Sequence, residues 1–338
     1  MSEIKNIHTL VEDIYDVMEN GADLTDEDAT QLGNAIANAL KSRLKEAQTP
    51  RTPTLRASNL GADPLNLWYN LHGYEGEALK PQTLLMFFLG DIIEEVLLAL
   101  AVVAGHTVEH QQSEVEIEGI KGHIDAVIDG HLVDVKSASP YSFTKFKDHT
   151  LNLENDAFGY ITQLSTYVQT CEHTTEEMGA FLVMNKVTGE LTLMELEGME
   201  QIDPFARAKH MKEMMARDTP PTAEEAPIKI KPMGKSGNMM LDVPHSYHDQ
   251  KANYMPELRK FIYSSGPVYM THVAVEPKVV ELDLKTGEVI PKKDVIVKPA
   301  KPVIKAIENP FTPPFSSTSS SPYSSSSFIW DTDDEPST

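Results

Sequence analysis

The segment from Gly122 to Ser137 constrains the fold more than any other part of this sequence. It reads GHIDAVIDGHLVDVKS, in which polar and apolar residues alternate on both sides of Asp129-Gly130. Asp-Gly is a favoured two-residue turn between antiparallel strands, and alternation with a period of two is typical of a strand with one buried face. The segment therefore predicts a β-hairpin in which Ile128 lies opposite His131.

Counting back from this turn places Asp125 opposite Asp134, and His123 opposite Lys136. Directly opposed residues in an antiparallel pair have their Cβ atoms about 4.5 to 5.5 Å apart, and like charges at that separation repel. We therefore expect a cation between the two carboxylates. The opposite face of the hairpin is predicted to be apolar, and it consists of Ile124, Ala126, Ile128, Val133 and Val135.

Oxygen ligands in this pattern suit a hard divalent ion such as Mg²⁺ or Mn²⁺. Lys136 shares the face of Asp134, where it could orient or deprotonate an attacking water, or stabilise the negative charge that develops on a phosphate. The alternative interpretation is a solvated strand face on which Asp and Lys alternate without a function.

A second acidic candidate lies on the long helix predicted over residues 82–104, in FFLGDIIEEVLLAL. On a helical wheel Asp91 and Glu95 fall together, whereas Glu94 falls among apolar residues. A carboxylate in apolar surroundings is costly unless it is paired or bound to a metal. Glu94 is therefore the preferred ligand candidate, and a helix end that reaches solvent is the alternative.

Gln163 and Tyr167, in QLSTY, are four residues apart on a helix predicted over residues 157–169. Residues at this spacing share one helix face. A glutamine amide can bond a phosphate oxygen or orient Lys136, and a tyrosine can stack on a sugar or a base. Without the other motifs, the pair would be an ordinary half-buried helix face.

Taken in order, the helix glutamate, GHID, DVKS and QLSTY resemble the motifs of the RecB-like branch of the PD-(D/E)xK nucleases, which includes phage exonucleases and CRISPR-adaptation nucleases. The resemblance covers about residues 54–170 and extends more weakly to about 275. It implies an α/β, restriction-endonuclease-like core with a central mixed sheet flanked by helices. It also implies that Glu94, Asp125, Asp134 and Val135 hold the metal ion, that Lys136 serves catalysis, and that the helix of Gln163 and Tyr167 packs beside the site.

Two further segments are candidates for DNA contact. TLRASNLGADPLNLWYNLHG resembles the first segment of the nuclease domain in this family, and Arg56, Ser58 and Asn59 fit phosphate contacts at a helix start. Core packing is the preferred interpretation of Trp68 and Tyr69 nearby. After the hairpin, SASPYSFTKFKDHT interleaves aromatic and basic residues, which suits single-stranded nucleic acid, although an ordinary loop is the alternative. The candidates there are Ser137, Tyr141, Lys145 and Lys147.

Other metal centres are not expected. Some related nucleases bind an iron–sulfur cluster through four cysteines, but Cys171 is the only cysteine of this chain. His245 and His248 have a spacing that zinc ligands can adopt, but no thiolates accompany them, so Zn²⁺ is not expected there either.

The chain divides into an N-terminal helical segment (residues 1–48, with helices near 3–20 and 26–46), a nuclease domain (49–295) and a tail (309–338). Within the domain the patterns predict helices near 64–72, 204–216 and 255–263, and strands near 113–118, 179–185, 190–196 and 277–282. The Ser- and Pro-rich tail is expected to be disordered. Its acidic end, Phe328 to Glu335, could dock on a replication protein, mimic DNA and cover the active site, or act only as a solubilising tail.

The net charge of −22 appears unfavourable for a DNA-binding protein, but it is unevenly distributed. The first 30 residues contain nine acids and one lysine, and the tail adds four acids without a base. A local basic channel and bound metal can still hold DNA, with a salt-sensitive affinity. Neither a signal peptide nor an apolar run of membrane-spanning length is apparent, so a cytoplasmic protein is expected, in the host cytoplasm if a phage encodes it.

The sequence thus predicts a Mg²⁺- or Mn²⁺-dependent deoxyribonuclease that hydrolyses phosphodiester bonds with a metal-activated water. An exonuclease of phage DNA replication, recombination or host DNA degradation is the favoured form. Two alternatives remain open. One is a structure-selective or single-strand endonuclease of the same superfamily, and the other is a non-catalytic DNA-binding partner in replication or recombination.

Overall fold

The computed structural model describes residues 5–291 except 50–51, 77, 175–177, 197–201, 229, 233–237, 242–246, 253, 255–257, 264–265, 272–279 and 283–288. The predicted tail (309–338), which includes Phe328 to Glu335, and His245 therefore lie outside the described residues. None of the helices in this described part is long and apolar enough to cross a membrane.

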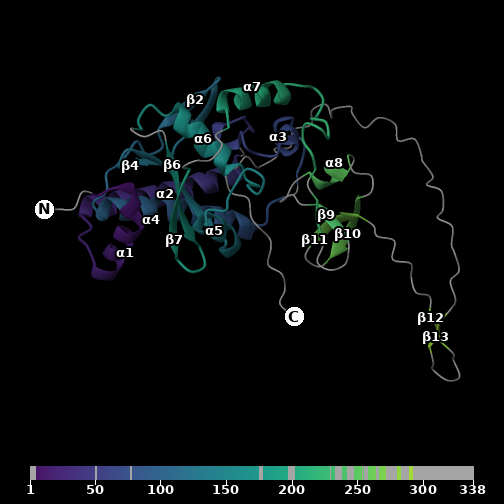
Figure 1. Ribbon diagram of the computed structural model, residues 1–338, viewed down its shortest axis with the longest axis horizontal. Coiled ribbons are helices and arrows are strands. Elements are labelled where there is room, and N and C mark those ends of the chain that lie inside the picture. Colours follow the sequence, from purple (N-terminus) through teal and green to yellow (C-terminus); the bar gives the residue numbers. More distant parts are fainter. Residues whose placement is uncertain are drawn as a thin grey trace.

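A five-stranded sheet forms the centre of the chain (Figure 1). Its order is β1 (Val108–Glu109), β4 (Ala126–Ile128), β5 (His131–Ala138), β6 (Gly179–Asn185) and β7 (Leu191–Glu195). β5 and β6 are parallel and the other neighbours are antiparallel. The predicted α/β fold with a central mixed sheet flanked by helices is confirmed.

Helices cover both faces of this sheet. α1 (Leu10–Asn20) and α4 (Pro81–Val103) pack against the face that contains Val133 and Val135. α5 (Pro140–Lys147) and α6 (Tyr160–Thr170) pack against the face that contains Leu132. Because side chains alternate along β5, Asp134 and Lys136 belong to the α6 side.

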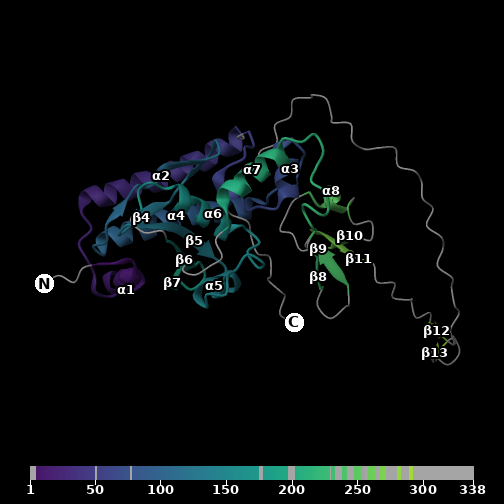
Figure 2. The same ribbon diagram turned by 45° about the horizontal axis from the view of Figure 1, so that its top comes forward.

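α2 (Asp26–Gln48) forms an outer layer that runs alongside α4 in both views (Figures 1 and 2). Arg43 of α2 donates two hydrogen bonds of 2.7 Å to the carboxylate of Asp91 on α4. The Asp91 carboxylate therefore anchors α2 to α4.

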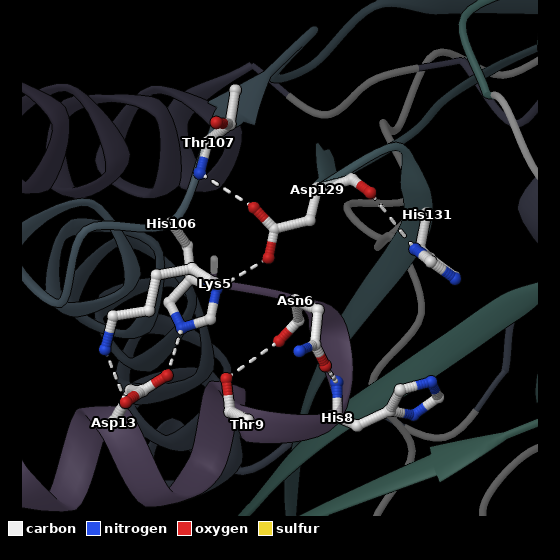
Figure 3. Close-up of polar contacts among 9 residues, drawn as sticks. All are labelled: Lys5, Asn6, His8, Thr9, Asp13, His106, Thr107, Asp129 and His131. Carbon is white, nitrogen blue, oxygen red and sulfur yellow. Dashed lines mark hydrogen bonds and ion pairs between the residues drawn. The ribbon is translucent and has the colours of Figure 1, made fainter. Parts of the chain in front are cut away.

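The N-terminal segment is attached to the sheet by a chain of polar contacts (Figure 3). The imidazole of His106 is completely buried between two carboxylates, with Nδ1 2.6 Å from Asp129 Oδ2 and Nε2 3.1 Å from Asp13 Oδ2. Lys5 Nζ lies 2.5 Å from the other oxygen of Asp13, and Asp129 Oδ1 accepts the N–H of Thr107 at 3.0 Å. Asp129, the aspartate of the predicted Asp-Gly turn, therefore also holds α1 in place through His106 and Asp13.

A second cluster is built from two helices and a two-stranded ladder. α3 (Pro64–Leu71) and α7 (Pro204–Met215) pack together against the two-stranded ladder of β2 (Glu114–Ile117) and β3 (Ile120–His123). Trp68 is 2% exposed in this cluster and donates a 3.0 Å hydrogen bond to the carbonyl of Arg217. Core packing of Trp68 and Tyr69 is therefore confirmed.

A small C-terminal sheet lies next to α3 and far from α1 in both views (Figures 1 and 2). Its order is β10 (Leu258–Tyr263), β11 (Gly266–Thr271), β9 (Met239–Leu241) and β8 (Ile230–Pro232), and α8 (His248–Ala252) precedes β10. β12 (Val280–Leu282) pairs with β13 (Val289–Pro291). The ring of His248 stacks on Tyr269 with centroids 4.9 Å apart.

Most of the predicted elements are confirmed within a few residues, including those near 82–104, 64–72, 204–216, 179–185 and 190–196. The helix predicted over 255–263 is wrong, because Leu258–Tyr263 forms a six-pair antiparallel ladder with β11. Aromatic and β-branched residues favour such a ladder once a partner strand is present. Sequence patterns also missed α5, which begins with Ser139 as its N-cap and Pro140 in its first turn.

Candidate active site

The β4–β5 hairpin forms with the predicted register but ends earlier than predicted. Ile128 pairs with His131, and the last pair of the ladder is Ala126 with Val133. Asp125 and Asp134 are one step beyond this pair, where the chain bends away from β5. The carboxylate of Asp125 accepts the main-chain N–H of Val135 at 2.8 Å, so a side chain replaces the missing strand partner.

The predicted pairing of His123 with Lys136 is wrong. His123 belongs to β3 and pairs with Glu114 of β2. The bend at Asp125 separates β3 from β4, and it also reverses the alternation of side chains. Ile124 consequently joins the apolar cluster of Val127 on the α6 side, and not the opposite face to which the alternation assigned it.

Asp134 is the centre of a buried polar cluster. It is fully buried, and Lys136, which is 3% exposed, forms an ion pair with its Oδ2. Gln163 of α6 donates from Nε2 to Asp134 Oδ1 at 3.1 Å, and the ammonium group of Lys136 lies 5.3 Å from the centroid of the Tyr160 ring. These contacts fix the two side chains of the DxK motif against α6.

Gln163 and Tyr167 occupy a buried face, and not the half-buried one of the alternative interpretation. They are 4% and 1% exposed, and Gln163 Nε2 lies 3.5 Å from the hydroxyl of Tyr167. A tyrosine with this exposure supports its neighbours, because a sugar or base would have to displace the surrounding core to stack on it. Burial and the charge of Asp134 raise the pKa of the Tyr167 hydroxyl.

Glu94 lies close enough to this cluster to sense its charges. Burial, and next the charge of Asp125, raise the pKa of the Glu94 carboxyl well above its usual range. Burial and the charge of Asp134 raise the pKa of Asp125 to about 7. Burial also raises the pKa of Asp134, although Lys136 acts in the opposite direction. Burial therefore opposes the ionisation of all three acids, and neighbouring carboxylates add to this effect at Glu94 and Asp125.

The donor chemistry of this cluster fits a divalent cation. Three carboxylates and one ammonium group carry a net charge of −2 when all four are ionised. Buried charge of one sign is costly unless an ion of the opposite sign compensates it. Within the described ranges, no group of three or more His, Cys, Asp or Glu side chains lies close enough to hold a metal ion. Mg²⁺ commonly takes only one or two protein carboxylates and completes its shell with water, and Glu94 and Asp125 are partly exposed.

The turn that carries Arg56, Ser58 and Asn59 lies beside Tyr167. It forms a 3₁₀ turn (Ala57–Asn59) that packs on α6 and β3. Gly122 of β3 permits this contact, because a Cβ atom there would lie 2.6 Å from Ala57 Cβ and 3.0 Å from Tyr167. The side chain of Asn59 is engaged within the turn, where its Oδ1 accepts the N–H of Arg56 at 2.8 Å. Ser58 and Arg56 are partly exposed.

The aromatic and basic residues after the hairpin divide between two environments. Phe143 and Phe146 are each 2% exposed and belong to the core, so they cannot stack on a base. Tyr141 is 59% exposed, and Lys145 Nζ lies 4.9 Å from its ring centroid. Lys147 Nζ forms an exposed ion pair of 2.6 Å with Glu190. Ser137 is partly exposed on β5.

Sequence reasoning missed the residue that contacts Glu94 directly. Gln112, in the turn between β1 and β2, donates from Nε2 to Glu94 Oε1 at 2.8 Å. It is an exposed residue in a polar turn, and no motif or period distinguishes it from its neighbour Gln111. Tyr160 was missed as well, although its position three residues before Gln163 on the same helix was a usable signal.

Comparison with known proteins adds little to this geometry. No family model matches the sequence, and no curated protein matches it. A solved structure described as the crystal structure of SSO0001 aligns at 18% sequence identity with a TM-score of 0.32, over 52% of this chain and 85% of that chain. A similarity this low supports no conclusion about shared fold or activity.

Proposed function

We propose that this chain is a divalent-metal-dependent deoxyribonuclease that hydrolyses phosphodiester bonds, as its resemblance to the PD-(D/E)xK nucleases implies. The observation that carries the proposal is the set of three carboxylates and one lysine at the end of the β4–β5 ladder, with its net charge of −2 when ionised. An exonuclease that acts during phage replication, recombination or host DNA degradation is the favoured form, and the cytoplasm is its proposed location.

In this proposal Glu94, Asp125 and Asp134, with the main chain of Val135, would hold Mg²⁺ or Mn²⁺. The bound ion would polarise a phosphate oxygen and lower the pKa of a coordinated water. Gln163 holds Asp134 through its 3.1 Å hydrogen bond, which orients this ligand. Lys136 would place its positive charge beside the phosphate, where negative charge develops in the transition state.

A nuclease assay with four DNA substrates tests the proposal. Linear duplex, linear single-stranded, closed circular duplex and circular single-stranded DNA are incubated with Mg²⁺, Mn²⁺ or EDTA. We expect the linear substrates to be degraded from their ends, the circles to persist, and EDTA to abolish the reaction. Cutting of circles would instead identify the endonuclease, and DNA binding with no cleavage in either metal would refute the enzymatic proposal.

Matched variants link the activity to the site. Asp134→Asn keeps the size of the side chain but removes a charge, so we expect it to lower the rate on the order of 10²-fold or more. Glu114→Gln is the control, because Glu114 is an exposed acid whose contact is an ion pair with Lys121 on the next strand. Equal activity of both variants would show that the cleavage does not depend on this cluster.

A further inference from the structure

The turn between β1 and β2 has an unusual backbone. His110 and Gln112 have positive φ angles of 55° and 54° although neither is glycine. Such residues carry a conformational cost, and glycine or asparagine is favoured at these positions. Ser113 closes the turn with a 3.2 Å hydrogen bond from its N–H to the carbonyl of His110.

Gln112 connects two of the three candidate metal ligands. Its side-chain amide donates to Glu94 Oε1 at 2.8 Å, and its main-chain N–H donates to the carbonyl of Asp125 at 3.3 Å. Glu94 lies on α4 and Asp125 at the bend between β3 and β4, so no local contact sets the distance between them. The left-handed conformation of Gln112 lets one residue reach both.

A neutral amide is suited to this role. An ammonium group, such as that of Lys136 beside Asp134, compensates the charge of a carboxylate and competes with a cation for it. An amide N–H occupies one lone pair of Glu94 Oε1 and leaves the other oxygen and the negative charge available. Groups that hydrogen-bond to metal ligands orient them, and their loss typically weakens metal binding 10- to 100-fold.

We propose that Gln112 is a positioning residue of the metal site: its side chain restrains Glu94 and its main chain restrains the Asp125 segment. This inference rests on the proposed function, because it assumes that these acids bind a metal ion. It explains why a glutamine occupies a position whose backbone favours glycine.

The variant Gln112→Gly tests the contribution of the side chain apart from that of the backbone, because glycine adopts the positive φ without strain and lacks the side-chain amide. Full-length protein without DNA is titrated with Mn²⁺, and the free ion is measured by electron paramagnetic resonance. We expect Mn²⁺ affinity to fall about 10- to 100-fold, while the melting temperature without metal equals or exceeds that of the wild type.

His110→Gly is the matched control, since it relieves the same backbone strain in the same turn without removing a contact to Glu94. It should bind Mn²⁺ as the wild type does. If Gln112→Gly binds Mn²⁺ within about twofold of the wild-type affinity, or more tightly, the positioning role is overturned while the metal site stands. Wild-type protein that binds no Mn²⁺ at millimolar concentration would overturn the metal site, and the role of Gln112 with it.

Discussion

Replacement of His106 by alanine should destabilise the protein by about 3 kcal/mol. Each ring nitrogen of His106 contacts a carboxylate oxygen, at 2.6 Å from Asp129 and 3.1 Å from Asp13. The side chains of these acids are only 12% and 19% exposed. Burial raises the pKa of Asp13, but hydrogen bonds from Lys5 and Thr9 lower it overall, so Asp13 stays ionised. The alanine variant therefore leaves a partly buried negative charge without the imidazole that lies beside it.

The magnitude follows from what the two acids retain. Leaving a buried hydrogen-bonding group without its partner costs about 1 to 3 kcal/mol. Asp13 keeps Lys5 at 2.5 Å, and Asp129 keeps the N–H of Thr107 at 3.0 Å, so about 1.5 kcal/mol applies to each acid and about 3 kcal/mol to the two together. At roughly 2 to 4 °C per kcal/mol for a domain of this size, the melting temperature should fall by about 6 to 12 °C.

Urea denaturation followed by circular dichroism measures this loss. His210→Ala, an exposed residue of α7, is the control and should change the stability by no more than about 0.5 kcal/mol. The double variant with Asp129→Asn should lose less than the sum of the two single variants, because one unpaired charge is removed with its partner. A loss below about 1 kcal/mol for His106→Ala, or strict additivity of the double variant, would refute the reasoning.

Three further predictions concern the site and its support. Burial and the charge of Asp134 raise the pKa of Asp125 from its ordinary value of 3.8 to about 7, so wild-type stability should fall as pH rises between these values; thermal melts of metal-free Asp125→Asn should therefore show a gain at pH 8 and none at pH 4. Gly122→Ala places a Cβ 2.6 Å from Ala57 Cβ and should cost about 1 to 3 kcal/mol in urea denaturation, whereas Gly33→Ala, whose Cβ meets nothing within 4 Å in α2, should gain up to about 1 kcal/mol. Saturating Mn²⁺ should raise the melting temperature of the wild type but not of Asp134→Asn, and an equal shift in both would place the ion elsewhere.

Local patterns were sufficient for much of the hairpin and for the long helix. The Asp129-Gly130 turn and the alternation after it depend on neighbours in sequence, and the ladder from Ile128 to Ala126 has the predicted register. The choice of Glu94 over Asp91 and Glu95 needed only the helical wheel and the cost of a carboxylate among apolar residues. The hairpin register and the bounds of the helix are confirmed because the period of each element is set locally, whereas the choice of Glu94 as a ligand stays a prediction.

The features that sequence patterns missed depend on contacts between distant segments. The bend at Asp125 is held by the N–H of Gln112, which donates to the Asp125 carbonyl, and by the N–H of Val135, which donates to the Asp125 carboxylate. Nothing in the alternation of GHIDAVID indicates where that bend falls, so His123 was paired with the wrong strand. The helix predicted over 255–263 is a different case, because β10 pairs with β11, the next strand along the chain, beginning with Tyr263 opposite Gly266.

The residues that stabilise β5 and the residues that it contributes to the site lie on opposite faces of the strand. Val133 and Val135 face α1 and α4, the side that His106 secures. Asp134 and Lys136 alternate with them and face α6. α6 and Gln163 hold Asp134 from the opposite face, whereas Glu94 lies on α4, which packs against α1. Loosening of α1 should therefore reach the site through Glu94 and not through Asp134. His106→Ala should bind Mn²⁺ more weakly than the wild type well below its melting temperature, and an unchanged affinity there would show that α4 holds Glu94 without support from α1.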